Sequence, residues 1–218
     1  DPRVLVDRLR AHLIDRGCRI RQAEVRAVEP APAVRLADGE RIAADAIVLA
    51  AGAWSAPLAA GCGDRILLES ERGYNATFAA PGIAVTRELI FAEHSFVASP
   101  LTAGLRIGGT VEFAGLAAPA HPARARALVT LARRYLPGLA AGDGQVWMGH
   151  RPATPDSLPV IGPSPRARGV FYAFGHGHLG LTQAATTGRL IAALVAGRAP
   201  HIDIGPFASD RFGSPHGG

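Results

Sequence analysis

Hydrophobic and polar residues in the first part of the chain follow a helical pattern and then strand-like ones. Residues 2–16 place their apolar side chains on one helical face, which predicts an amphipathic helix. Residues 20–28 alternate apolar and polar side chains, as a half-buried strand does. Residues 34–36 and 41–42 flank Asp38-Gly39, a pair typical of tight turns, so we expect a hairpin there.

Two further segments have the composition of buried strands. Residues 46–52 form a continuous apolar run that ends in glycine, which predicts a strand buried on both faces with its carboxyl end directed to a ligand. Residues 171–174 are also apolar, and a glycine-rich turn at 175–180 follows them. The helical pattern from about residue 179 to 196 then predicts a strand, a turn and a helix in succession.

The middle of the chain has a different texture. Strand-like segments at residues 72–78, 87–91, 95–99 and 105–111 are separated by short turns, which favours an antiparallel sheet. One amphipathic helix is expected at residues 122–136, where Pro-Gly follows it.

These patterns divide the chain into lobes. We expect residues 1–65 and 149–212 to form one lobe of α/β type, split around an antiparallel α+β lobe at residues 66–148. Residues 213–218 are rich in glycine and are expected to be a flexible tail.

Composition narrows the classes of function. The chain has 218 residues, of which 48% are hydrophobic and 19% charged, as in globular proteins. All 23 basic residues are arginine, and the absence of lysine excludes Schiff-base and lysine-base mechanisms. The net charge is +5, but the arginines are scattered and aromatic residues are only 6%, which argues against nucleic-acid binding.

The two cysteines, Cys18 and Cys62, have neither a metal-ligand spacing nor a disulfide framework, which favours a reducing compartment. The sequence shows neither a signal peptide nor an apolar run near the ~20 residues of a spanning helix. We therefore expect a cytoplasmic protein, with peripheral attachment to the inner membrane as an alternative.

Two neighbouring segments carry candidate chemistry. Arg151 stands among prolines, a rigid setting in which a guanidinium can bind a carboxylate through two hydrogen bonds. Residues 175–182 would present backbone N–H groups and the positive end of a helix dipole to an electron-rich ligand. Together they indicate a carboxylate substrate that faces an electron-accepting ring, while Thr154 and Asp156 are expected to brace the loop between them.

Several motifs taken jointly resemble a known family. They are DAIVLAAGAWS at residues 45–55, ERGYN at 71–75, HRPATPDSLPVIGP at 150–163, FGHGHLGL at 174–181 and TGRL at 187–190. The chain resembles the carboxy-terminal portion of FAD-dependent D-amino-acid dehydrogenases and oxidases, including those acting on hydroxy-D-proline. Glycine oxidase and sarcosine oxidase are more distant. The resemblance implies part of a glutathione-reductase-like FAD-binding lobe beside an antiparallel substrate lobe.

The resemblance also assigns residues. Arg151 would bind the substrate carboxylate, and Phe96 and the weaker candidate Tyr74 would line the substrate pocket. The residues implied to contact FAD are Val25, Ala50, Ala51, Gly52, Trp54, Gly175, His176, Gly177, His178, Leu179, Gly180, Leu181 and Thr182. For Trp54 a place in the hydrophobic core is the alternative, and for Tyr74 an ordinary sheet position.

Cofactor attachment and reaction follow from the same resemblance. Sarcosine-oxidase relatives tether FAD to a cysteine where Gly149 and His150 stand here, so noncovalent FAD is implied. A D-amino or cyclic imino acid would pass a hydride from its Cα to the flavin, and the resemblance to dehydrogenases implies an electron acceptor other than oxygen, such as a quinone. No essential general base is evident, and the mechanism does not require one if the amine arrives neutral.

One family feature has no counterpart in this sequence. The family's G-x-G-x-x-G turn and following acidic residue, which hold the ADP part of FAD, match neither residues 104–109 nor 175–180. The chain thus resembles such an enzyme without its amino-terminal half, so a noncatalytic fragment or a subunit needing a partner chain is a second hypothesis. A third is a metal-dependent hydrolase using His176 and His178.

Overall fold

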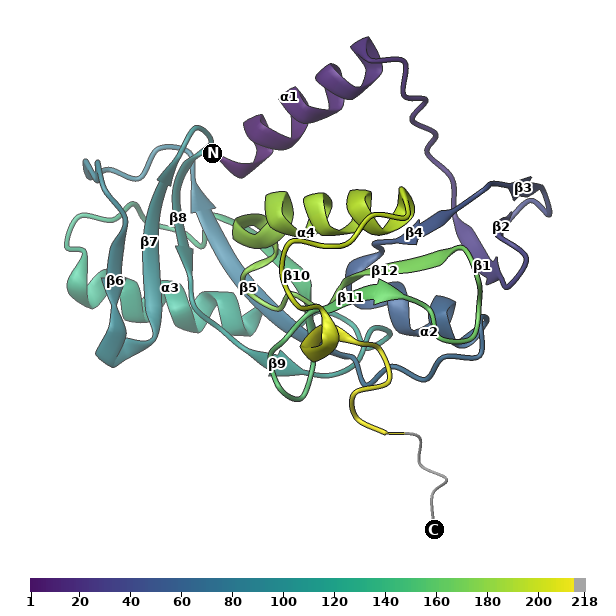
Figure 1. Ribbon diagram of the computed structural model, residues 1–218. Coiled ribbons are helices and arrows are strands. Elements are labelled where there is room, and N and C mark those ends of the chain that lie inside the picture. The colour runs from purple at the N-terminus through teal and green to yellow at the C-terminus, as the bar shows by residue number, and fades with distance from the viewer. Residues whose placement is uncertain (214–218) are drawn as a thin grey trace. The chain divides into compact units, whose positions relative to one another are not determined.

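The computed structural model describes residues 1–213, which form two compact units (Figure 1). Unit 1 contains Asp1–Leu9 and Glu71–His150, and unit 2 contains Arg10–Ser70 and the chain from Arg151 onward. Apart from Gly213, the tail expected at residues 213–218 lies outside the described residues. None of the described helices is both long enough and apolar enough to cross a membrane.

Unit 1 is built on an antiparallel sheet. Its strand order is β10-β5-β8-β7-β6, and β9 pairs with β5. The strands are β5 (Glu69–Phe78), β6 (Leu89–Phe91), β7 (Phe96–Leu101), β8 (Gly104–Gly108), β9 (Glu112–Phe113) and β10 (Gln145–Ala153). Pairing is antiparallel between β5 and β8, β7 and β8, and β6 and β7, so the expected antiparallel sheet is confirmed.

The core of unit 1 lies between this sheet and α3 (Ala123–Tyr135), the helix expected at residues 122–136. Leu128 and Val129 of α3 pack with Phe78 and Ile107 of the sheet, and all four are at most 5% exposed. A short 3₁₀ turn, η2 (Ala92–His94), connects β6 to β7.

Unit 2 begins with a small antiparallel sheet of β1 (Val25–Glu29), β2 (Ala33–Leu36) and β3 (Arg41–Ala43). The hairpin between β2 and β3 is confirmed, and Gly39 in its turn has φ +89°, a backbone conformation that favours glycine. The predicted strand start at Ile20 is wrong, because β2 has only four residues and its last, Leu36, pairs with Val25.

A second sheet of unit 2 has the order β11-β12-β4. Here β4 (Ile47–Leu49) runs parallel to β12 (Val170–Phe174), and β11 (Val160–Pro163) is antiparallel to β12. The prediction that β4 is buried on both faces is wrong: Leu49 is 5% exposed but Val48 is 44% exposed. Val48 lines a cavity together with residues of α4, so this face of β4 is not fully covered by packed side chains.

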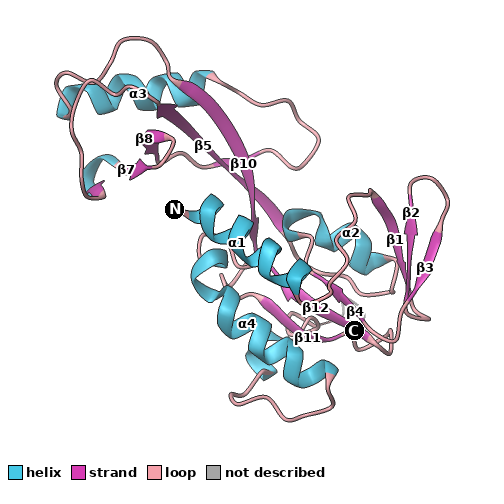
Figure 2. Cartoon of the chain, turned by 90° about the horizontal axis from the view of Figure 1, so that it is seen from above, coloured by secondary structure: helices cyan, strands magenta, loops and turns pink. Residues whose placement is uncertain are grey.

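Helices complete unit 2. The predicted carboxy-terminal helix is confirmed as α4 (Gly180–Val195), which runs along β11 and β12 and packs Leu190 and Ile191 on Ile161 (Figure 2). The 3₁₀ turn η1 (Gly52–Trp54) leads directly into α2 (Ser55–Ala60), and η3 (Gly205–Phe207) follows α4.

The first helix of the chain has no buried side chain. The predicted helix is confirmed as α1 (Pro2–Asp15), and its apolar residues Val4, Leu5, Leu9 and Leu13 are 40–52% exposed. In water an amphipathic helix of this length is marginal without packing, so this face needs a partner surface to be stable.

Candidate functional site

The turn between β12 and α4 is held in a conformation that glycine permits. Gly175 has φ +83° and Gly177 has φ +51°. A Cβ on Gly175 would lie 3.1 Å from Thr154 Cγ2, so the turn packs closely on the chain that follows Arg151. The Gly177 N–H donates to the Pro152 carbonyl at 2.9 Å and fixes the turn against the end of β10.

The start of α4 offers unused hydrogen-bond donors. Leu179 is the N-cap residue, and no side chain caps the helix. The N–H groups of Gly180, Leu181 and Thr182 precede the first intrahelical hydrogen bonds, and the helix dipole adds a partial positive charge there. Leu179 and Leu181 are 53% and 50% exposed. This end of the helix can therefore stabilise negative charge on a bound group.

A cavity of about 350 Å³ lies beside the turn. Its lining residues come from β4, β12, the turn and α4: Val48, Ala50, Ala173, His176, Gly180, Ala184, Thr187, Gly188 and Ile191. Three of the predicted FAD contacts, Ala50, His176 and Gly180, thus share one cavity. Gly180, Ala184 and Gly188 of α4 recur at every fourth position, which places them on one face of the helix. This spacing is a sequence signal of the cavity that the motifs did not indicate.

The carboxyl ends of β4 and β12 lie side by side because Leu49 pairs with Tyr172 in the parallel ladder. The residues that follow these strands therefore meet at the carboxyl end of the sheet, which is where open α/β sheets bind ligands. At this end of the sheet Gly52 has φ +56° and begins η1, and Trp54 is 53% exposed. The alternative that Trp54 belongs to the core is wrong.

The remaining predicted FAD contacts differ in exposure. Ala51 and Gly52 are half-buried, while Ala50 and His178 are exposed. Val25 is 36% exposed at the start of β1. Burial and pairing alone assign none of them to a ligand, and these residue assignments stay predictions.

His176 is positioned by α4. One ring nitrogen, Nε2, lies 2.9 Å from Thr187 Oγ1, and burial lowers the pKa of His176 below its usual value. Burial thus favours the neutral ring, in which one nitrogen donates and the other accepts a hydrogen bond according to the tautomer. Within residues 1–213 no three His, Cys, Asp or Glu side chains gather as metal ligands, so the hydrolase alternative has no structural support.

Arg151 lies in β10 and not in a loop, since the strand continues to Ala153. It is half-buried. The turn after it is braced as expected: Thr154 Oγ1 donates to the Leu158 carbonyl at 2.7 Å, and Leu158 N–H donates to Asp156 Oδ1 at 3.1 Å. The same short segment thus carries the predicted substrate ligand and contacts the predicted flavin turn.

The other predicted substrate contacts belong to unit 1. Phe96 is 1% exposed and stacks on Phe91 with ring centroids 4.2 Å apart. Tyr74 is also 1% exposed; its hydroxyl donates to Glu112 Oε2 at 2.5 Å and accepts from the His121 N–H at 2.9 Å. Tyr74 is the main reason that the pKa of Glu112 is lowered. Both aromatic rings sit in the core of unit 1, and their place in a substrate pocket stays a prediction.

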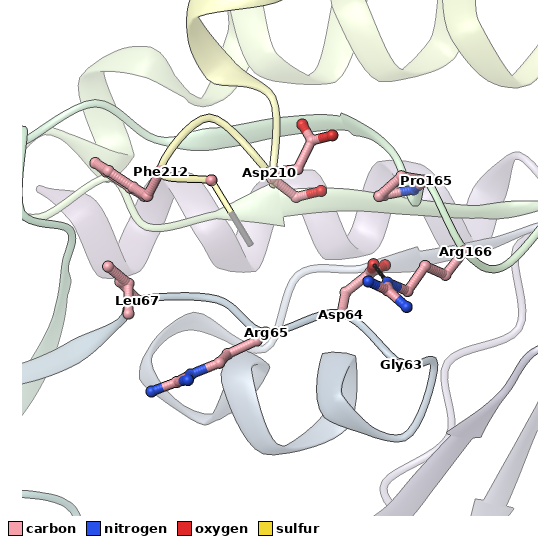
Figure 3. A pocket seen from close by; sticks show the side chains of 10 residues that line it. Gly63, Asp64, Arg65, Leu67, Pro165, Arg166, Asp210 and Phe212 are labelled. Carbon is pink, nitrogen blue, oxygen red and sulfur yellow. Dashed lines mark ion pairs between the residues drawn. The ribbon is translucent and has the colours of Figure 1, made fainter. Parts of the chain in front are cut away.

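A second cavity of about 350 Å³ in unit 2 contains none of the predicted site residues (Figure 3). The buried Asp64 on its wall accepts hydrogen bonds from Ser164 Oγ and, at 2.6 Å, from the Tyr172 hydroxyl. Burial and Asp64 together raise the pKa of Tyr172. Arg166 Nε lies 3.7 Å from the other oxygen of Asp64. This network ties β12 to the segment after α2.

Curated proteins have sequences similar to that of this chain. The chain is 39% identical over 97% of its length to a D-amino-acid oxidase of Bradyrhizobium diazoefficiens, covering 52% of that protein. It is 37% identical over 82% of its length to a D-amino acid dehydrogenase of Paramagnetospirillum magneticum, covering 45% of that protein. The chain therefore spans about half the length of the curated relatives it matches.

Solved structures agree with the expected fold. Glycine oxidase from Geobacillus kaustophilus superposes with a TM-score of 0.71 at 27% identity, over 90% of this chain and 52% of that one. Iminodiacetate oxidase from Chelativorans gives a TM-score of 0.74 at 24% identity, over 88% and 53% of the two chains. The family model described as FAD dependent oxidoreductase matches residues 1–194. The chain belongs to this family, the DAO family of FAD-dependent oxidoreductases.

Proposed function

We propose that this chain supplies the flavin-ring side and the substrate side of an enzyme that oxidises the Cα–N bond of a D-amino or cyclic imino acid. The observation that carries the proposal is the uncapped start of α4 after the glycine turn, beside the carboxyl ends of β4 and β12. The names of the similar oxidases and dehydrogenases support the substrate class.

The residues around the turn fit a flavin. When bound, FAD supplies the acceptor for the hydride. The N–H groups of Gly180, Leu181 and Thr182 would stabilise negative charge on a bound flavin, as the donors of an oxyanion hole do. Small residues such as Ala50 and Ala173 leave room beside the turn. By the resemblance, Val25, Ala51, Gly52 and Trp54 would contact the ribityl and adenine parts of FAD.

FAD is held without a covalent bond in this proposal. Gly149 and His150 precede Arg151 and offer no thiol. Cys62 is buried with its Sγ toward the Val28 carbonyl, and Cys18 lies in the segment between α1 and β1.

Arg151 binds the substrate carboxylate and thereby orients the Cα–H toward the ring. By the resemblance Phe96 is a candidate pocket residue; a phenylalanine cannot donate a hydrogen bond to the carboxylate, so Arg151 carries more of that interaction. Tyr74 is the weaker pocket candidate. The amine arrives neutral and the described residues need supply no general base.

The ADP-binding half comes from the remainder of a longer polypeptide or from a partner chain. The exposed apolar face of α1 and the edge of β4 are surfaces that such a half can cover. The proposal includes an electron acceptor other than oxygen, such as a quinone, and a cytoplasmic location with peripheral attachment to the inner membrane as the alternative.

Anaerobic flavin reduction tests the activity. We combine the chain with its ADP-binding half, load FAD, and add D-amino acids or cyclic imino acids one at a time while recording flavin absorbance. Bleaching by at least one D-amino or imino acid, and slower bleaching by the L-enantiomer, is expected. A flavin that stays oxidised with every such compound contradicts the proposal.

A further inference from the structure

Arg211, a residue near the end of the described chain, reaches back to the loop that follows Arg151. Its Nε donates to Asp156 Oδ2 at 2.8 Å and its Nη2 donates to Asp156 Oδ1 at 2.9 Å. This two-bond geometry is the strong, directional form of an arginine–carboxylate pair. The Arg211 side chain is 10% exposed and the Asp156 side chain 32%, so the arginine side of the pair is shielded from water and the carboxylate side is partly solvated.

The same guanidinium also binds backbone. Its Nη2 donates to the Leu158 carbonyl at 2.7 Å, and its Nη1 donates to the Ala208 carbonyl at 3.1 Å. The Leu158 carbonyl additionally accepts from Thr154 Oγ1. Arg211 therefore holds Asp156 and Leu158 in the turn at residues 154–158, which we call the brace loop, and links them to the Ala208 backbone after η3.

The brace loop has a conformation that needs such support. Ser157 lies in its centre with φ +60°, a left-handed conformation that costs a non-glycine residue free energy of order 1 kcal/mol. Asp156 Oδ1 accepts from the Leu158 N–H and closes the turn around Ser157. Arg211 also holds the pKa of Asp156 down to about 2, so the carboxylate is charged throughout the physiological range.

The brace loop in turn contacts the glycine turn at residues 175–179. Thr154 Cγ2 occupies the space next to Gly175, and the Gly177 N–H is bonded to the Pro152 carbonyl, two residues before Thr154. Contacts thus run without a break from Arg211 through Asp156 and Thr154 to the glycine turn, all within unit 2.

We propose that Arg211 is a positioning residue that, through the brace loop, fixes the glycine turn for flavin binding and the backbone beside Arg151 for the substrate carboxylate. The inference rests on the proposed function for its purpose, but the clamp itself is a property of unit 2. Arg211 touches neither the flavin nor the substrate in this proposal.

Hydrogen exchange in the 218-residue chain tests the clamp without a cofactor. The variants are Arg211→Met, Arg211→Lys, Asp156→Asn and the double Arg211→Met/Asp156→Asn. Arg198→Met is the matched control, because Arg198 is an exposed arginine just beyond α4 in the same unit. We expect amide exchange in residues 175–179 to rise at least tenfold in the Met and Asn variants, and less in the Lys variant. The double variant should not exceed the larger single one.

Two results would overturn the clamp. One is unchanged exchange at residues 175–179; the other is an equal rise in the β1–β3 sheet, which would mean general destabilisation. If the Met variant does not fold, the Lys and Asn variants decide by the same criterion.

FAD titration of the complete enzyme then separates the clamp from the proposed function. We expect the Kd for FAD to rise at least tenfold in Arg211→Met and to stay unchanged in Arg198→Met. Faster exchange in the glycine turn with unchanged FAD affinity would mean that the clamp exists but the turn does not bind the flavin. In that case the proposed function fails at this turn, while the structural assignment of Arg211 to the brace loop remains.

Discussion

Arg151 is the residue on which substrate affinity should depend most. Replacing it with alanine in the complete, FAD-loaded enzyme removes a charge-assisted carboxylate pair, an interaction worth about 2–5 kcal/mol in kcat/KM. Arg151→Lys should recover only part, because an ammonium cannot form the two parallel hydrogen bonds of a guanidinium. Steady-state kinetics with a D-amino acid measure this, with Arg198→Ala as control. Near-wild-type kinetics for the alanine variant would remove Arg151 from the substrate site.

The Asp156–Arg211 pair should also give stability a specific dependence on pH. The pKa of Asp156 is about 2 in the folded chain against an ordinary value of 3.8. Because the folded state binds the proton less readily, the pair stabilises the fold fully above about pH 4 and loses its contribution as the pH falls toward 2. Thermal melts should show a gap in Tm between the wild type and Asp156→Asn that narrows over this range. A gap that stays constant down to pH 2 would show that the carboxylate charge is not its source.

At the scale of elements, replacing a glycine should have opposite effects on stability in the turn before α4 and within α4. Gly175→Ala places a Cβ at φ +83° and 3.1 Å from Thr154, and should lower the free energy of unfolding by roughly 1–3 kcal/mol. Gly188→Ala, in α4 with open space around it, should instead raise it by about 0.5–1 kcal/mol. Denaturant unfolding of the two variants checks the opposite signs. Equal effects would contradict the strained geometry of the turn.

Patterns of local sequence predicted the elements that local forces determine. The helices α1, α3 and α4 and the Asp-Gly hairpin depend on residues close together in the chain, and all are confirmed. The strand start at Ile20 is wrong because it depends on the length of the partner strand β2, and the double-sided burial of β4 is wrong because it depends on what covers each face of the sheet. Local pattern carries no information on such partners.

The site shows the same division. The glycine turn and Arg151 are visible as motifs, whereas Arg211 bonds to Asp156 across 55 positions and no spacing announces it. The sequence suggests Tyr74 as a pocket residue, yet its hydroxyl donates to Glu112 and accepts from the His121 N–H. A side chain's direction depends on tertiary neighbours, so the sequence could name Arg151, Asp156 and Tyr74 but not the residues that bond to them.

At the scale of the whole molecule, apolar surface remains exposed where a second half could pack. The helix α1 has six apolar side chains that are 40–53% exposed, and Val48 on the edge strand β4 is 44% exposed. These residues of α1 are Val4, Leu5, Val6, Leu9, Leu13 and Ile14. Exposed apolar patches of this kind favour association with a complementary chain or with a second copy.

We therefore predict that the 218-residue chain alone does not hold FAD at micromolar concentration. The glycine turn and the start of α4 can face the ring, but the adenosine and phosphates normally rest on a G-x-G-x-x-G turn and an acidic residue that this sequence lacks. The contacts that remain must still offset an association cost of about 4–15 kcal/mol. Adding the ADP-binding half should restore binding, because it supplies those contacts and covers the exposed apolar surface.

Flavin fluorescence during titration of FAD into the purified chain measures this, with and without that half. Arg198→Met should behave as the wild type in both arms, since it lies outside the proposed site. Stoichiometric quenching by the chain alone would show that the turn and the groove beside α4 suffice to anchor FAD, and that the dinucleotide-binding turn of the relatives is dispensable here. The apolar face of α1 would then need another partner, and sedimentation of the FAD-loaded chain would reveal whether that partner is a second copy.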